Sequence, residues 1–124
     1  MKLLKMSALL GALLMAPAAF SHHSSSGIDQ QGSVTVSGTV KEFRWGNPHS
    51  WIELEVVNAK GETELWNFEM NPPVFLVKQG FTRSSLKAGD KVDVIAKPFF
   101  DKRPGGIFRA VKLADGKILG EQPK

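Results

Sequence analysis

The sequence predicts a small all-β domain that contains one short helix. Apolar and polar residues alternate with a period of two along several segments, and these segments are rich in β-branched residues. Glycine, proline and asparagine cluster between the segments, where they indicate turns. The chain has 124 residues, 42% of them hydrophobic, which is enough for one packed domain and too few for two.

The alternating segments define the expected strands. They are residues 33–43, 51–57, 62–70, 91–97 and 107–113, with 117–119 as a short sixth strand. Gly38 interrupts the first of them and predicts a bulge or a sharp bend there. A turn at 58–61 predicts that the second and third strands form a hairpin. A Pro-Gly-Gly run predicts that residues 98–106 form a loop before the fifth strand.

Between the third and fourth strands the sequence predicts a helix of about two turns. Asn71 is the expected N-cap and Pro72 the expected first helical residue, because proline loses no hydrogen bond at that position. Gly80 marks the expected C-terminal end. Three strands, a helix and two further strands is the element order of an OB-fold. We therefore expect a five- to six-stranded OB-fold-like barrel over residues 33–120, with an open β-sandwich or another small barrel as the alternative.

Residues 1–21 have the layout of a secretory signal peptide. Two lysines precede an apolar run over residues 6–15, and a proline followed by small residues comes next. The run is shorter than the ~20 residues of a membrane span, so we expect export without a membrane span after cleavage; a retained N-terminal anchor is the alternative. Cleavage is expected after Ser21 or after Ala18. The polar residues 22–32 are expected to form a flexible N-terminal arm.

The composition excludes several kinds of site. The absence of cysteine excludes disulfides, thiolate metal sites and thiol nucleophiles. Loss of the two lysines of the signal peptide lowers the formal net charge from +4 to +2, and no basic cluster with interleaved aromatic residues is found. Binding to nucleic acid is therefore not expected. The sequence has no evident pair of catalytic carboxylates, phosphate-binding glycine loop or Gly-x-Ser-x-Gly motif, so no enzymatic activity is expected.

The three histidines, His22, His23 and His49, all lie beyond the signal peptide. If cleavage leaves His22 first, its α-amine and imidazole chelate one metal ion, and His23 or His49 supplies a further nitrogen. Such a tetragonal nitrogen set suits Cu(II), and neutral imidazole is available because its pKa is about 6.5. The arrangement is similar to the histidine brace of secreted copper proteins. The sequence thus predicts a copper site formed by these three histidines, provided that cleavage does not leave Ala19 first.

Aromatic residues predict a second kind of site. Trp45 and Trp51 flank an Asn-Pro-His loop, and OB-folds bind ligands at the corresponding loop. The alternative function is therefore a metal-free module that binds a small molecule or a partner protein through the Trp45/Trp51 loop face. A Cu(I) site that adds Met70 to His49 and these tryptophans ranks below the Cu(II) site. A helper subunit of an exported oxidoreductase is a third class. Trp66, Phe68 and Met70 itself are expected in the barrel core.

Several short motifs occur between residue 22 and about residue 119. They include His22-His23-Ser24, a Trp-x-Asn-Pro-His-x-Trp run over 45–51, Trp66-Asn67-Phe68-Glu69 and Leu86-Lys87-Ala88-Gly89-Asp90. Together they resemble the motifs of a family of small exported bacterial proteins of unknown function. The resemblance implies a compact β-rich domain and a periplasmic location. It implies no catalytic residues, because the family has no established activity.

Overall fold

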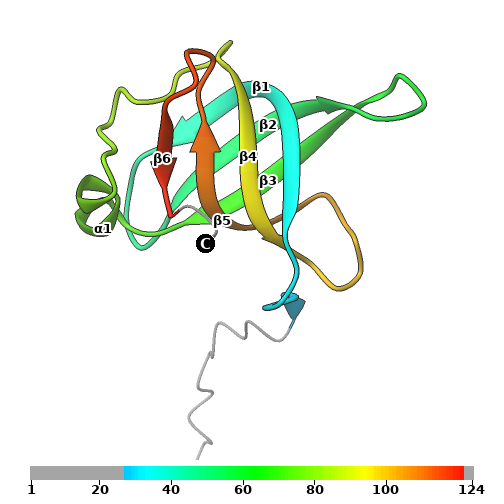
Figure 1. Ribbon diagram of the computed structural model, residues 1–124, viewed down its shortest axis with the longest axis horizontal. Helices are drawn as coiled ribbons and strands as arrows, with labels where there is room; N and C mark the ends of the chain where they lie inside the picture. The colour runs from blue at the N-terminus through cyan, green and yellow to red at the C-terminus, as the bar shows by residue number, and fades with distance from the viewer. Residues whose placement is uncertain (1–26, 122–124) are drawn as a thin grey trace, which may run out of the picture.

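A computed structural model describes residues 27–121 of the chain. Its strands are β1 (Val34–Arg44), β2 (Ser50–Val57), β3 (Thr63–Met70), β4 (Lys91–Pro98), β5 (Gly105–Lys112) and β6 (Ile118–Gly120), and its helix is α1 (Pro73–Lys78) (Figure 1). The expected signal peptide lies outside the described residues, as do His22 and His23.

The strands form a closed five-stranded barrel with β6 added outside it. The sheet order is β3-β2-β1-β4-β5-β6, and a parallel pairing of β3 with β5 closes the barrel. The first half of β1 pairs with β4 and its second half pairs with β2, so this strand serves both sides of the barrel. The helix lies between β3 and β4 in the chain. This is the OB-fold arrangement, and it confirms the fold class predicted from the sequence.

The bend of β1 depends on a glycine, but the bulge lies elsewhere. A Cβ atom on Gly38 would lie 2.7 Å from the backbone oxygen of Glu55, so only glycine allows β1 and β2 to approach so closely here. The register with β2 is irregular between Val40 and Glu42, which makes Lys41 the bulged residue. Of the two alternatives predicted at Gly38, the structure shows the bend, where β1 passes from β4 to β2, and not the bulge, which lies at Lys41.

The loop expected over 98–106 is shorter than predicted. Gly105 and Gly106 begin β5 and pair in parallel with Asn67 and Phe68 of β3. Both glycines have positive φ angles, 132° and 155°. A Cβ on Gly105 would lie 2.5 Å from the Asn67 carbonyl oxygen, and one on Gly106 would collide with the Lys97 carbonyl oxygen. These glycines permit the backbone contacts that close the barrel, although a Pro-Gly-Gly run is locally typical of a loop.

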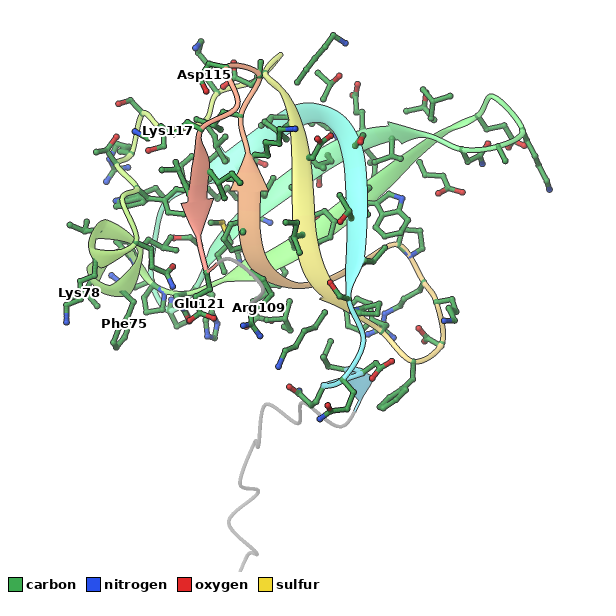
Figure 2. The ribbon with its side chains drawn as sticks, in the orientation of Figure 1. Phe75, Lys78, Arg109, Asp115, Lys117 and Glu121 are labelled. Atoms are coloured by element: carbon green, nitrogen blue, oxygen red, sulfur yellow. The ribbon has the colours of Figure 1, made fainter. Side chains whose placement is uncertain are left out.

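The helix begins one residue later than predicted. Pro72 is the N-cap residue and Pro73 is the first helical residue, with no side-chain capping bond. The Asn71 carbonyl instead accepts a hydrogen bond from the Ser50 backbone N–H at 3.4 Å, which extends the pairing of β2 and β3. Phe75 is 52% exposed, and Figure 2 shows it with Lys78 on the outer side of the helix. No helix within residues 27–121 is long and apolar enough to cross a membrane.

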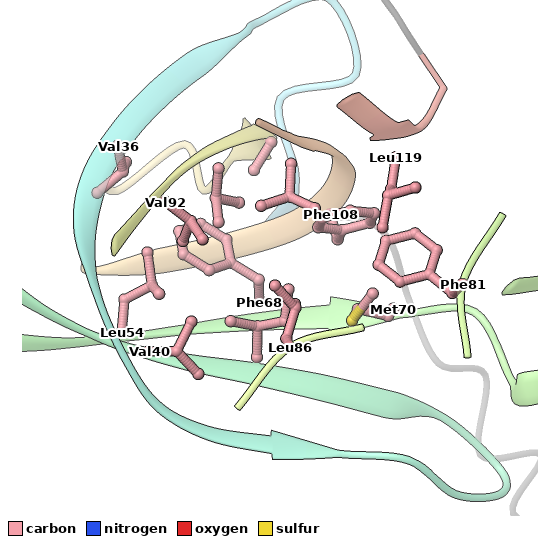
Figure 3. Close-up of a cluster of buried hydrophobic side chains, with 14 of the residues drawn as sticks. Val36, Val40, Leu54, Phe68, Met70, Phe81, Leu86, Val92, Phe108 and Leu119 are labelled. Carbon is pink, nitrogen blue, oxygen red and sulfur yellow. The ribbon is translucent and has the colours of Figure 1, made fainter. Parts of the chain in front are cut away.

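The barrel interior is filled by aliphatic and aromatic side chains from every strand and from α1 (Figure 3). Phe68 and Met70 are buried in the core, as predicted, whereas Trp66 is partly buried at the edge of the core and stacks on Phe68. The described part of the expected arm, residues 27–32, is also held on the barrel. Ile28 is 5% exposed and pairs with Phe99, so the expected flexibility does not apply to this part.

Candidate functional site

The loop between β1 and β2 is tied together by a buried serine. The Ser50 hydroxyl is fully buried; it accepts a hydrogen bond from the Gly46 N–H at 3.2 Å and lies 3.4 Å from the Gly46 carbonyl oxygen, to which it donates. The intervening Asn47–Pro48 peptide bond is cis. These contacts fix both ends of the loop. They hold His49 at the position where the chain enters β2.

His49 forms a close pair with a carboxylate of the neighbouring strand. Its Nδ1 lies 3.0 Å from Oε1 of Glu69, and the two side chains are 31% and 29% exposed. Glu69 pairs in register with Trp51 on β2, which brings the carboxylate beside the end of the loop. When Nδ1 carries the proton and donates it to the carboxylate, Nε2 is the ring nitrogen that has a lone pair. The pair can therefore orient an imidazole for metal binding, or form an ion pair when the imidazole is protonated.

The outer face of β2 beside this pair is predominantly acidic. Trp51, Glu53 and Glu55 alternate with the buried residues of the strand. Lys41 binds Glu53 with an N–O distance of 2.8 Å, and the hydrogen bond and charge of Glu53 raise the pKa of Lys41 above its ordinary value of 10.5. This lysine is thus already paired. The face carries more carboxylates than cations, and it favours cations over anions.

The two tryptophans predicted to form a stacking face have different surroundings. Trp45 packs edge-on against Phe43, with ring centroids 5.9 Å apart, and it lies against the core. Trp51 lies on the outer face of the barrel, where the Arg44 guanidinium is 5.7 Å from its ring centroid. Trp51 is therefore the better placed of the two for contact with a ligand.

The structure describes only one member of the predicted copper set. Within residues 27–121, no group of three or more histidine and acidic side chains is arranged to hold a metal ion. His49 and Glu69 bring together two side chains of these types. His22 and His23 lie outside the described residues, so the predicted set stays a prediction.

Sequence reasoning missed Glu69 as the partner of His49. The expected turn at 58–61 would pair residue 57 with 62 and therefore residue 51 with 68, whereas the observed register pairs Val57 with Thr63 and Trp51 with Glu69. This shift of one residue decides which side chain lies beside the loop, so the expected hairpin did not identify Glu69. The loop between β4 and β5 carries two phenylalanines and two cations. There, Arg103 stacks 3.8 Å from the Phe99 ring centroid and also binds Asp101.

Two structures of mitochondrial single-stranded DNA-binding protein Rim1 from S. cerevisiae have a similar fold. One is 10% identical, with a TM-score of 0.50 over 75% of this chain and 98% of that chain. The other is 14% identical, with a TM-score of 0.49 over 67% of this chain and 94% of that chain. At these identities the likeness shows the fold alone.

No curated protein matches the sequence. A family model described as a family of unknown function, DUF6152, matches residues 11–108, which is most of the chain. The match includes the loop that holds His49 and the strand that carries Glu69. The chain therefore belongs to the DUF6152 family.

Proposed function

We propose that this protein is an exported, periplasmic binding protein that binds copper(II) where β2 begins. His49 is the ligand that the barrel supplies, and His22 and His23 are the ligands that the N-terminal segment supplies. The observation that carries the proposal is the 3.0 Å contact between His49 Nδ1 and Glu69 Oε1. The protein acts as a carrier or store of the ion rather than as an enzyme.

A carboxylate bound to one nitrogen of a histidine is typical of metal ligands. It fixes the tautomer and the ring orientation, and it makes the other nitrogen more basic. Loss of such a carboxylate lowers metal affinity by about 10- to 100-fold. The backbone of Glu69 pairs with β2 on one side and with β5 on the other, which fixes the position from which its carboxylate contacts the imidazole.

The charge of the surrounding face also supports a cationic ligand. Glu53, Glu55 and Glu69 lie on or beside the strands that OB-folds use for binding, and Lys41 is paired with Glu53. Single-stranded nucleic acid requires a positively charged groove with stacking aromatic residues. Rim1 is a single-stranded DNA-binding protein. We propose that this chain does not share that ligand, because its own face would repel phosphates.

A copper titration of the protein secreted from its own leader tests the proposal. Intact mass first establishes whether the mature chain begins with His22. Competition with a chelator then gives the copper(II) affinity of the wild type and of Glu69→Gln. We expect the affinity of the variant to fall by about 10- to 100-fold. Glu55→Gln removes the same charge from the same face away from His49, and it should leave the affinity close to that of the wild type.

Two results would overturn the copper proposal. One is a wild-type affinity no higher than that of a short peptide with the sequence of residues 22–26. The other is equal affinity in the wild type, Glu69→Gln and His49→Ala. Either result would mean that the barrel contributes no ligand to the ion.

The metal-free alternative is favoured by one observation, the position of Trp51 on the outer face beside Arg44. In that case a planar small molecule or a partner protein stacks on this ring. Trp51→Ala should then remove binding, while Trp45→Ala should act mainly through stability because Trp45 packs against Phe43. Copper should have no effect on that binding.

A further inference from the structure

A polar cleft lies on the outer side of β4 and β5. It consists of two adjoining cavities of about 180 Å³ each. Both are lined by the same four side chains, which are Gln30, Lys97, Arg109 and Glu121. A water molecule occupies about 30 Å³ of liquid, so each cavity has room for a ligand of only a few heavy atoms.

Arg109 occupies a special position in the strand. Ile95 pairs with Ala110 and Ala96 pairs with Phe108, so Arg109 is an additional residue on β5 with no opposite residue on β4. Phe108 and Ala110 are buried on either side of it. Bulges of this kind redirect side chains and are frequent beside binding sites. The bulge lies where Arg109 lines both cavities.

The hydrogen bonds that the described residues form in the cleft leave a buried donor of Arg109, its Nε–H, without an acceptor. Arg109 Nη2 lies 2.9 Å from Oε2 of Glu121, and the Glu121 N–H donates to the Arg109 carbonyl at 2.8 Å. Figure 2 shows the two side chains at the same end of the barrel. Within residues 27–121, Arg109 Nε is buried without a hydrogen-bond partner. A buried N–H group without an acceptor is unfavourable, so the hydrogen bonds within the described part of the protein leave this guanidinium group incompletely satisfied.

The charge and chemistry of the cleft identify the kind of ligand. Lys97 and Arg109 provide two cations against one carboxylate, Glu121, which leaves a net charge of +1 among these three side chains. Lys97 Nζ donates to the Gln30 amide oxygen at 2.8 Å, and amide groups supply most of the remaining polar lining. A planar guanidinium group matches a carboxylate, which accepts two parallel hydrogen bonds from it.

We propose that this cleft binds a small monocarboxylate between Arg109 and Lys97. The Glu121 carboxylate competes with the ligand for Arg109. Glu121 follows β6 near the end of the chain and its side chain is 56% exposed, so its replacement by a ligand requires no change in the barrel. His49 does not line this cleft, so the site is independent of the copper site proposed above.

Titration of the metal-free, ¹⁵N-labelled full chain with sodium propionate tests this site. The Arg109 Nε–H resonance should shift and saturate at millimolar concentrations. Glu121→Gln should bind propionate about 3- to 10-fold more tightly, because it removes the competing carboxylate. Lys97→Gln should remove the saturable shift of the Arg109 Nε–H resonance. Arg109→Gln lacks that resonance, and it should remove the saturable shifts of the backbone amides that line the cleft. The dispersed backbone spectrum shows that both variants are folded.

A second arginine–carboxylate pair gives the matched control. Arg103 binds Asp101 at 3.1 Å on the exposed loop between β4 and β5, where both side chains are more than half exposed. Asp101→Asn should leave propionate binding unchanged. The proposal is overturned if sodium chloride or phosphate causes the same shift at equal ionic strength. It is also overturned if Glu121→Gln binds no more tightly than the wild type, or if Lys97→Gln binds as the wild type does.

Discussion

The His49–Glu69 and Arg109–Glu121 pairs are alike in geometry and different in surroundings. The first joins atoms 3.0 Å apart and the second joins atoms 2.9 Å apart. The first lies beside an acidic strand face, and both of its members are about two-thirds buried. The second lines a cleft with an excess of positive charge, and its carboxylate is more than half exposed. Under the two proposals, the same kind of contact would support a metal ligand in one region and compete with an anion in the other.

Both carboxylates are expected to matter for binding and to contribute little to folding stability. Partly exposed ion pairs contribute about 0–1 kcal/mol to folding, so removing either carboxylate should leave the barrel intact. The two regions share the parallel pairing of β3 with β5 that closes the barrel. Glu69 pairs with Ile107 of β5, and Ile107 lines the cleft. Changes in that pairing should affect both regions together.

The largest effect is expected for Gly106→Ala, which acts on both regions at once. Gly106 pairs with Phe68 on β3 and with Pro98 on β4, and its new Cβ would collide with the Lys97 carbonyl oxygen. We expect a loss of more than about 2 kcal/mol in the free energy of unfolding, measured with urea. Gly116→Ala is the control, because Gly116 also has a positive φ but its Cβ would meet open space, so only about 1 kcal/mol should be lost.

The next effect separates the two regions. Glu69→Gln should lower copper(II) affinity by about 10- to 100-fold and change the free energy of unfolding by less than about 1 kcal/mol. Chelator competition and urea unfolding measure the two quantities. Propionate binding should be the same in this variant and the wild type. A parallel loss of copper and propionate binding would show that the two regions are not independent.

The reciprocal variant should act in the other region alone. Glu121→Gln is expected to strengthen propionate binding by about 3- to 10-fold and to leave copper(II) affinity unchanged. The Arg109 Nε–H resonance reports the first quantity and chelator competition reports the second. Weaker propionate binding in this variant would mean that Glu121 helps to build the cleft rather than competing with its ligand.

The smallest effect concerns a carboxylate outside both regions. The Glu64 side chain accepts hydrogen bonds from Asn58 at 3.0 Å and from the Trp66 indole at 3.2 Å, and these bonds hold its pKa below the ordinary 4.5. Because the pKa of Glu64 is lower in the folded state than in the unfolded state, the ionised carboxylate stabilises the folded state above pH 4.5. This stabilisation is lost as the pH falls through the pKa that Glu64 has in the folded state. The Trp66 indole N–H resonance should therefore titrate with a midpoint below 4.5. A midpoint at or above 4.5 would contradict this, and Glu64→Gln should abolish the titration.

The strand pattern and the helix could be predicted because they depend on local alternation and on turn residues. Two local signals misled. Gly105 and Gly106 resemble a loop, whereas the structure uses their missing side chains for close backbone contact with β3 and β4. Asn71 resembles an N-cap, whereas its carbonyl continues the β2–β3 pairing. Both errors come from tertiary contacts that outweigh local preference.

The candidate site was only half visible in the sequence. His49 stands out because histidine is rare in this chain, whereas the hairpin register expected from the turn at 58–61 is one residue away from the register that brings Glu69 opposite Trp51. The cleft could not be found in this way. Arg109 is placed by a bulge against β4, Gln30 comes from before β1, and Glu121 comes from beyond β6. No local spacing encodes a group assembled from such distant segments.

The most direct test of the central claim is the Cu(II) EPR spectrum of the protein secreted from its own leader, with one equivalent of copper, compared with that of His49→Ala. If His49 is the ligand supplied by the barrel, the wild type should give one nitrogen-rich tetragonal signal, and the variant should lose an imidazole nitrogen from it. Identical spectra for the two proteins would contradict the claim that the His49–Glu69 pair forms a copper site.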